Sequence, residues 1–549
     1  MKRNFKTDII GWIVGIVVAG LMFAIGNYLC VPRIGWSFGF LFLIAFSLGM
    51  GAVASLIVGA TAYDEYEGVH PSIFTGIAAG IVVLAILVSW IVGWQCFHVD
   101  EIKARLDVTE ITQEELVEML PDVDEEGAYS WADSATARKL ATRKTGELTE
   151  LVSIFTVSNT ANTAISEKGL VKYVPMEYAG FLKAMKSDNI PGYVDVNPVK
   201  QSADYKEHVI RYSPSAYFSY DLIRHARNCM PNEYFGHYTF QVSPEGEPTW
   251  VIELERTCNS WSVREVYAVA LINAETGACE KYELGNAPTW VVSIHGDTAQ
   301  AVYNGYGRMI NGFWNLSGVG QTTTTNDFGY VAINGEMYYT FGITSAVIDG
   351  GDESNLGVML YNAHTNKAYY CKVAGAEEYS AMEAAEGVVQ NFGYEAAFPS
   401  LTNVDGSLTY VMVLKDSNGI VKQYGMVNYD NYTIAVTADS LNACRVAYAK
   451  AMAKGGNVKV ESSDWTEAEI TVDVIEYIVM GGETYVYICD VDGNVYKSNF
   501  DEGFISVKAC QMITIKYQDG SDIKPMTLVS TKTVVSEVAP TISDSDETN

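Results

Sequence analysis

The sequence contains few of the residues that usually carry catalysis or hold metal ions. It has seven histidines among 549 residues, and no two of them match the H-x-x-x-H or HExxH spacing of a helical zinc site. It also has no P-loop and no C-x-x-C pair. The G-x-S-x-G match at residues 35–39 opens an apolar run instead of a strand-to-helix turn. We therefore assign no catalytic and no cofactor-binding residue, and the sequence favours a protein that is not an enzyme.

Basic residues are scarce beyond the first hundred positions. Of the 36 basic and 66 acidic residues, four and five lie in the first hundred, which leaves 32 and 61 and a net charge near −29. A surface of this charge repels phosphate backbones. Nucleic acid is therefore excluded as a partner.

Charged residues are absent from three apolar runs near the N-terminus, and no comparable run follows residue 98. The runs cover residues 9–30, 35–62 and 72–94, and each exceeds the roughly 20 residues needed to cross a hydrocarbon core. A cleaved signal peptide is the alternative for the first run, but that run is too long for the apolar part of such a peptide. We expect a short N-terminus at residues 1–8 and a three-helix anchor in the lipid bilayer at residues 9–98.

The basic residues near these runs are evenly divided between the two sides of the membrane. They are Lys2, Arg3 and Lys6 on one side, and Arg33, Lys103 and Arg105 on the other. Because the first helix usually dominates orientation, we expect a cytoplasmic N-terminus. Three crossings of the cell membrane then place the soluble region outside the cytoplasm.

The nine cysteines suggest no metal knuckle or redox pair, because their number is odd and their spacing irregular. In an oxidising space some of them could pair, for example Cys229 with Cys258. Our expectation, however, is that the cysteines are buried singly in strands.

Residues 99–149 have the pattern of a helical connector. The stretch from Thr112 to Glu115 is a capping box that opens a short helix. Asp133 is placed to cap a second helix that is broken at Gly146.

Residues 150–450 repeat a loose pattern of one helix and three strands. Acidic-Gly turns lead into alternating strands at residues 245–256 and 405–416. Hairpin patterns at residues 193–205, 270–282 and 358–370 share one shape, and helical patterns precede several of them, at residues 176–186, 216–229 and 381–390. A period of about 60 to 80 residues predicts an array of small modules, each with a helix on an antiparallel sheet, and hence an α+β class.

The turn at residues 272–277, Ile-Asn-Ala-Glu-Thr-Gly, closes a unit that resembles PepSY-type modules. The order of the whole chain is similar to that of uncharacterised bacterial membrane-anchored proteins, through the stretches at residues 212–217, 311–315 and 375–381. The resemblance implies a bacterial cell envelope and a modular build. It also implies one function as an alternative, a regulator or inhibitor of an envelope peptidase.

The end of the chain has a different sequence pattern from the modules. Short strands with tight Gly turns at residues 455–528 predict a small β-barrel of OB or SH3 type. Residues 529–549 are rich in Ser, Thr, Asp and Glu, and we expect a disordered acidic tail there.

One acidic cluster is a candidate calcium site. It consists of Asp349, Asp352, Glu353 and Asn355, whose side-chain oxygens are the ligands that calcium prefers. The same residue types also form ordinary turns without any ion. A second acidic stretch at residues 490–494 sits at a hairpin turn, which turn chemistry explains.

Aromatic residues are the other candidate contacts for a ligand. Trp314, Tyr338 and Tyr339 would bind a glycan or peptide if exposed, whereas strand propensity would place them in a core. We expect a membrane-anchored extracytoplasmic binding or scaffold protein whose partner is an envelope protein, a peptide or a wall polymer. An envelope hydrolase that acts through paired carboxylates is the alternative.

Overall fold

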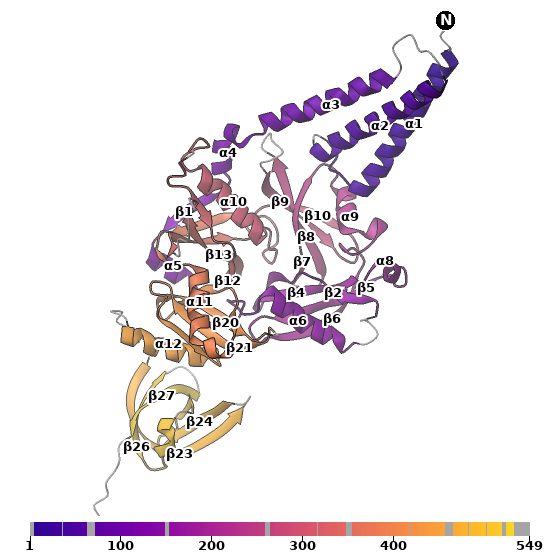
Figure 1. Cartoon of the computed structure of the whole chain (residues 1–549). Helices are drawn as coiled ribbons and strands as arrows, with labels where there is room; N and C mark the ends of the chain where they lie inside the picture. Colours follow the sequence, from indigo (N-terminus) through magenta and orange to yellow (C-terminus); the bar gives the residue numbers. More distant parts are fainter. Residues whose placement is uncertain are drawn as a thin grey trace, which may run out of the picture. The chain divides into compact units, whose positions relative to one another are not determined.

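The structure is a computed structural model in which two compact units are recognised, residues 1–456 and residues 457–549 (Figure 1). It describes residues 5–35, 37–62, 72–148, 153–257, 264–315, 317–346, 354–417, 419–455, 465–480, 483–500, 502–518 and 523–531.

Three apolar helices open the first unit, α1 (Phe5–Cys30), α2 (Phe38–Ala62) and α3 (Ser72–Val92). Small residues let α1 and α2 approach closely, because a Cβ added to Gly51 would lie 2.5 Å from the carbonyl oxygen of Gly15.

Two stretches of the described residues are long and apolar enough to cross a membrane, residues 9–30 with 22 residues and 38–58 with 21. Three spans were expected, and two stretches qualify as candidate spans by length and composition, whereas the third, residues 76–92, is a shorter apolar helix. The two long stretches are only 11% and 33% buried, so they are not core helices of a water-soluble domain. The one nearest the N-terminus has the length and composition that a signal sequence also has.

The connector is less helical than expected. It contains the predicted helices with their caps: Thr112 accepts the N–H of Glu115, whose carboxylate accepts the N–H of Thr112, and Asp133 caps α6. It also contains a strand, β1, which pairs in parallel with the edge strand β16 of the third sheet. An edge strand offers unpaired backbone groups, and this long-range pairing decides the conformation of β1. The elements are η1 (Gln95–Phe97), α4 (Val99–Lys103), β1 (Asp107–Ile111), α5 (Gln113–Met119) and α6 (Ser134–Gly146).

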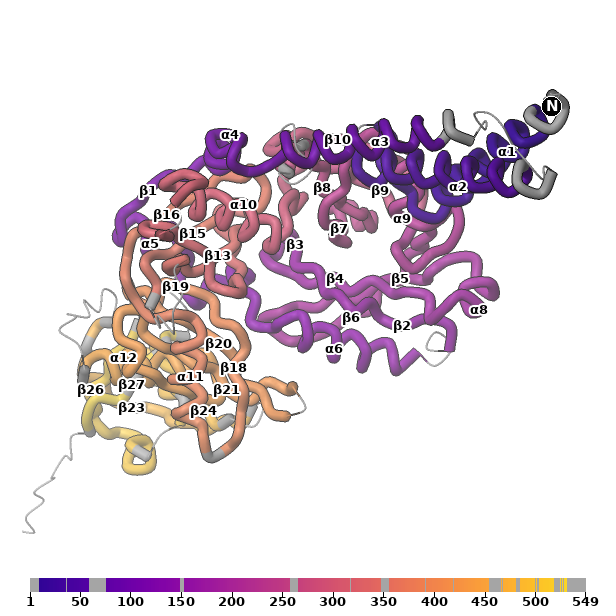
Figure 2. Tube along the Cα trace, turned by 45° about the horizontal axis from the view of Figure 1, so that its top comes forward, coloured from indigo at the N-terminus to yellow at the C-terminus, as the bar shows by residue number. Residues whose placement is uncertain are grey.

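The first two modules each contain an antiparallel sheet. The order in the first sheet is β2-β4-β5-β6, with β3 paired to β4, and α6 runs along this sheet (Figure 2). The order in the second sheet is β10-β9-β8-β7. The elements are β2 (Phe155–Val157), β3 (Asn162–Ser166), β4 (Gly169–Tyr178), α8 (Phe181–Ala184), β5 (Ile190–Asn197), β6 (Ser202–Ile210), η2 (Phe218–Tyr220), α9 (Leu222–Cys229), β7 (Tyr234–Val242), β8 (Pro248–Thr257), β9 (Arg264–Asn273) and β10 (Cys279–Glu283).

The next two modules each begin with a helix. The third sheet has the order β1-β16-β15-β13-β11 with β12 on β13, and the fourth has β18-β20-β21-β22 with β19 on β20. The elements are α10 (Gly296–Met309), β11 (Thr322–Thr324), β12 (Gly329–Ile333), β13 (Glu336–Ser345), β14 (Ser354–Asn355), β15 (Gly357–Asn362), β16 (Lys367–Cys371), β17 (Gly375–Ala376), α11 (Glu378–Val388), η3 (Gln390–Phe392), β18 (Glu395–Ala396), β19 (Ser400–Val404), β20 (Ser407–Lys415), β21 (Val421–Asn428), β22 (Ala435–Ala438) and α12 (Leu441–Gly455).

The predicted hairpins are confirmed, but one predicted helix is wrong. Hairpins β5–β6, β9–β10 and β15–β16 cover the three predicted turns. Residues 176–178, predicted as helical, continue strand β4, because Tyr178 pairs with Phe155 of β2 and their rings pack 5.5 Å apart. Only the four residues of α8 are helical there. Tertiary packing thus overrides the local helical pattern.

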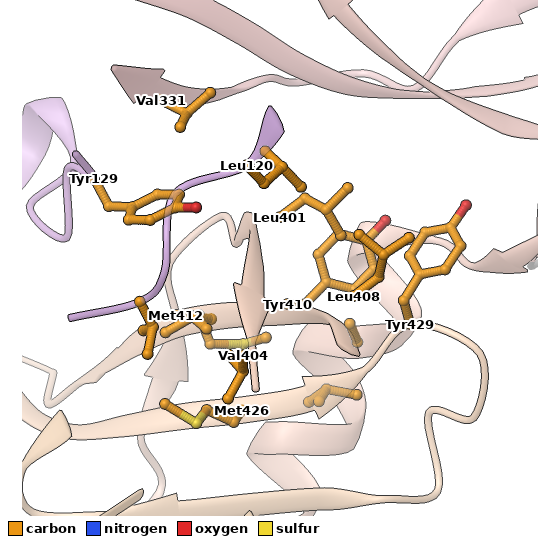
Figure 3. Close-up of a cluster of buried hydrophobic side chains, with 14 of the residues drawn as sticks. Leu120, Tyr129, Val331, Leu401, Val404, Leu408, Tyr410, Met412, Met426 and Tyr429 are labelled. Atoms are coloured by element: carbon orange, nitrogen blue, oxygen red, sulfur yellow. The ribbon is translucent and has the colours of Figure 1, made fainter. Parts of the chain in front are cut away.

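The third sheet is covered on both faces. Adjacent strand residues point to opposite faces, so Tyr338 packs into the core shared with the fourth module while Tyr339 packs into the core under α10. In the first of these cores, Leu120 and Tyr129 of the connector lie against strands of the fourth sheet (Figure 3). The hydroxyl of the buried Tyr129 donates to the carbonyl of Pro121, which satisfies its polar group.

The second unit forms a strand ladder that closes on itself in the order β23-β24-β25-β27-β26. Strand β23 is long and pairs with β26 in its first part and with β24 in its second. The last strand of this unit, β27, extends to Thr531, so residues 529–531, which were predicted to be tail, are strand. Residues 532–549 of the predicted tail lie outside the described residues. The elements are β23 (Trp465–Met480), β24 (Glu483–Asp490), β25 (Val495–Asn499), η4 (Glu502–Ser506), β26 (Met512–Gln518) and β27 (Ile523–Thr531).

Candidate functional site

Helix α9 places two arginines beside the apolar helices. Asp221 caps this helix by accepting the N–H of Arg224, and Leu222 and Ala226 are buried in the core of the second module. This packing leaves Arg224 and Arg227 at the side of α9 that meets the apolar helices.

Cation–π contacts and hydrogen bonds join this module to the end of α1 and the loop that follows it. The guanidinium of Arg224 lies 4.1 Å from the ring centroid of Tyr28 and donates to the carbonyl of Tyr28 at 2.6 Å. The N–H of Ile34 donates to the carbonyl of Pro231 at 2.9 Å. The loop between α1 and α2 therefore lies against the second module, and Figure 1 shows α9 of this module beside the end of α1.

A cavity of about 660 Å³ lies at this junction. Its walls come from the start of α2, the end of α3, helix α9 and strand β7. Most of its lining is apolar or aromatic, which is usual for sites that hold organic ligands. The apolar and aromatic side chains are Pro32, Phe38, Trp90, Ile223, Tyr234, Phe235 and Tyr238.

Arg33 and Arg227 supply the charge of the cavity. Burial, and next the nearby charge of Arg33, lower the pKa of Arg227 to about 10, so the guanidinium of Arg227 is still cationic at neutral pH. Arg227 donates to the carbonyl of Glu233 at 2.6 Å and lies over the ring of Phe235. Among the described residues, no carboxylate lines the cavity. The cavity therefore combines apolar walls with positive charge.

The nearby carboxylate of Glu233 is bound to other residues. It accepts hydrogen bonds at 2.7 Å from Lys281 and from the hydroxyl of Tyr267. Burial alone would raise the pKa of Glu233, but these two hydrogen bonds, together with the charges of Lys281 and Arg33, outweigh it and lower the pKa. Lys281 forms an ion pair with Glu233 at 2.7 Å, and the charges of Arg33 and Arg227 also act on this carboxylate.

A disulfide ties α9 to β10 next to this site. It joins Cys229 to Cys279, and His225 lies beside both sulfurs while its Nε2 donates to the carbonyl of Gly277 at 2.7 Å. The partner of Cys229 is therefore Cys279 and not Cys258, which lies outside the described residues. Stable disulfides occur mainly in proteins of oxidising compartments.

The structure describes one residue of the candidate calcium cluster. Asn355 is buried, and its amide nitrogen donates to the carbonyl of Ala376 and to the hydroxyl of Tyr410, both at 3.2 Å. Asp349, Asp352 and Glu353 lie outside the described residues. In the second acidic stretch, Asp490 accepts the N–H groups of Asp492 and Asn494. These are bonds of an ordinary turn.

The three candidate aromatics do not form one surface. Trp314 is 75% exposed, whereas Tyr338 is 8% and Tyr339 2% exposed. The hydroxyl of Tyr339 donates to the carbonyl of Ile294. The structure brings neither tyrosine to Trp314, and the two tyrosines contribute to cores.

The sequence indicates neither the cavity nor its charge. Arg33 follows the first apolar run, and Arg227 stands almost two hundred residues later on an amphipathic helix. The one available signal is that an arginine stands near the end of each of the two segments that come into contact: Arg33 just after α1, and Arg227 in the last turn of α9.

No protein-family model and no curated protein matches the chain. Among solved structures, an exo-β-1,3-galactanase from Phanerochaete chrysosporium with bound β-1,3-galactotriose aligns at a TM-score of 0.16 and 11% identity, over 67% of this chain and 81% of that chain. A TM-score this low carries no argument about fold or function.

Proposed function

We propose that the chain is a membrane-anchored extracytoplasmic binding protein of a bacterial envelope, and that its cavity holds the anionic headgroup of an amphiphile. One observation carries the proposal: a cavity with apolar walls and two guanidinium groups lies where the apolar helices end. The proposal does not require an enzyme activity.

The position of the cavity supports an amphiphilic ligand. The apolar helices end at Cys30 and Val92, and Arg33 and Trp94 follow these ends. Arginine and tryptophan are typical of the membrane–water interface, where lipid phosphates lie. An ordinary phospholipid or a lipid-linked envelope precursor would present both the negative charge and the chain that the walls accommodate.

Two observations support the extracytoplasmic orientation. The loop after α1 contacts the second module, so both lie on the same side of the membrane, opposite the N-terminus. The disulfide between Cys229 and Cys279 favours an oxidising compartment for that side. A cytoplasmic N-terminus agrees with both observations.

We expect Cys510, an exposed free cysteine of the second unit, to react with a membrane-impermeant maleimide in intact cells. The Cys510→Ser variant measures the background from the other cysteines. Labelling of Cys510 without lysis would place the modules outside the cytoplasm. Labelling of Cys510 only after lysis would contradict the orientation and favour an intracellular scaffold.

We expect the double variant Arg33→Gln/Arg227→Gln to lose bound anionic lipid. A hydrogen bond to a charged group contributes about 1.5–3 kcal/mol, so the loss of two should lower retention by tenfold or more. The measurement is native mass spectrometry of the full-length protein, purified from membranes of phosphatidylcholine with and without phosphatidylglycerol.

Arg308→Gln is the matched control, because Arg308 is an exposed arginine of α10 outside the cavity. Thermal unfolding of each variant shows whether it still folds. Equal retention of phosphatidylglycerol by the wild type, the control and a folded double variant would contradict the headgroup assignment.

The alternatives rest on the sequence. The resemblance to PepSY-type modules supports a regulator or inhibitor of an envelope peptidase, and co-purification with a protease would favour it. A hydrolase would need two carboxylates about 5–9 Å apart in a cleft. The cavity has none among the described residues, so the hydrolase is the weaker candidate.

A further inference from the structure

Two histidines from distant segments meet between the second and third modules. His237 lies on β7, and His295 is the N-cap residue of α10. The centroids of their rings are 4.6 Å apart. Asp297, in the first turn of α10, lies on the same side, with a carboxylate oxygen 3.5 Å from Nδ1 of His295. One donor atom from each of these three residues lies within 4.8 Å of the other two.

A buried carboxylate holds the two histidine backbones in place. Glu253 on β8 is 3% exposed. One of its oxygens accepts the N–H of His295 at 2.7 Å, and the other accepts the N–H of His237 at 2.9 Å. The second oxygen also accepts the hydroxyl of Thr298 at 2.9 Å. A charged side chain is costly to bury, and these three bonds offset part of the cost.

The strand is irregular at the point where it presents His237. The pairing of β7 with β8 shifts register between Phe235 and Tyr238, as in a β-bulge. The shift frees the N–H of His237 to bond the carboxylate of Glu253. A Cβ at Gly236 would lie 2.6 Å from that carboxylate, so the approach requires glycine. Bulges often aim a side chain at a functional site.

The hydrogen bond between Thr298 and His237 resembles those that orient histidine ligands in metal sites. Its hydroxyl donates to Glu253 and accepts from Nδ1 of His237 at 3.1 Å. A proton on Nδ1 leaves Nε2 of His237 with a lone pair. Metal-bound histidines usually have their second nitrogen held in this way by a carboxylate, a carbonyl or a hydroxyl group. Nδ1 of His295 accepts the N–H of Asp297 at 3.2 Å, a bond that an ion at Nδ1 would replace.

We infer that His237, His295 and Asp297 bind one divalent transition-metal ion of the zinc class, with Glu253 and Thr298 as positioning residues. Imidazole ligands favour such an ion over calcium or magnesium, which prefer oxygen. His237 and Asp297 have side chains 50% and 63% exposed, so the ion would keep a position open for water or another ligand. None of the three ligand residues lines the cavity, and the site does not depend on the proposed function.

The test is metal binding by the full-length protein without a histidine tag. After treatment with a chelator, the protein is titrated with Zn²⁺ by calorimetry and with Co²⁺ by visible absorption. We expect one ion per chain at this site. We expect Asp297→Asn and His295→Ala each to weaken binding by about tenfold or more, and Glu253→Gln to weaken it by about 10 to 100-fold. Asp297→Asn tests the site without disturbing the core, because that side chain is mostly exposed.

Two controls separate this site from other metal-binding groups. His208→Gln removes a histidine of β6 that lies outside the cluster and should leave binding unchanged. Cys229→Ser/Cys279→Ser removes two members of the other candidate metal cluster among the described residues, and at a temperature where this less stable variant is folded it should also leave binding unchanged. Absence of binding at saturating Zn²⁺, or equal binding by wild type and a folded Asp297→Asn variant, would overturn the inference.

Discussion

Replacing Glu378 by glutamine is expected to stabilise the protein at alkaline pH by about 3 kcal/mol. Glu378 begins α11 and is buried. Burial raises its pKa from 4.5 to about 7, although the N–H of Gly342 and the amide of Asn355 bond the carboxylate and lower it in part. A shift of this size corresponds to about 3 kcal/mol, because each pKa unit is worth about 1.36 kcal/mol.

The direction of the pH dependence follows from the raised pKa. Between about pH 4.5 and pH 7 the folded protein binds a proton at Glu378 that the unfolded chain releases. The free energy of unfolding therefore falls as the pH rises through this window, and it stays low above pH 7. A glutamine carries no charge, so its burial does not change with pH, and its side-chain oxygen can still accept the N–H of Gly342.

Chemical unfolding from pH 4 to pH 9 measures this effect. The difference between Glu378→Gln and the wild type should be small near pH 4 and should grow up to about pH 7. Glu383→Gln, at an exposed position of the same helix, is the control and should follow the wild type at every pH. A constant difference across the range would show that Glu378 does not titrate near neutrality.

Removing the disulfide between Cys229 and Cys279 is expected to lower the free energy of unfolding by about 4 kcal/mol. The two cysteines are 50 residues apart. In the chain-entropy model, closing a loop of about this length restricts the unfolded chain by roughly that amount. The double variant Cys229→Ser/Cys279→Ser should therefore unfold at a clearly lower temperature.

The comparison is made by thermal unfolding of the oxidised protein, the double variant and Cys510→Ser. Cys510 is an exposed free cysteine, so its replacement should leave the melting temperature unchanged. Mapping of the alkylated cysteines in unreduced protein gives an independent check. Alkylation of Cys229 and Cys279 in that sample would show that they are not paired and would remove the argument for an oxidising compartment.

Local features of the fold are predictable from the sequence because their causes lie within a few residues. The capping box at Thr112 and Glu115 and the cap at Asp133 are present as predicted. So are the hairpins, whose turns lie between strands that pair with each other. By contrast, strand β1 pairs with a strand some 260 residues away, and no local pattern indicates it.

The candidate sites could not be predicted in the same way. Asn355 has the residue type of a calcium ligand, but its side chain is buried against Tyr410, which follows it by 55 residues. Glu253 is one acidic residue among 66, and only the fold brings it to the backbones of His237 and His295. Residue types and their spacing along the chain do not show which distant residues come into contact.

The sequence by itself determined the apolar N-terminal segments, the α+β modules and the acidic character of the chain. Hydrophobicity and periodicity can be read from short stretches of sequence, and the net charge is the sum of the charged residues. Only the tertiary structure decided which cysteines pair, which tyrosines are buried, and where arginines and histidines gather. These outcomes depend on contacts between residues far apart in the chain. Such contacts form because burying apolar surface between sheets and helices favours one arrangement of the modules.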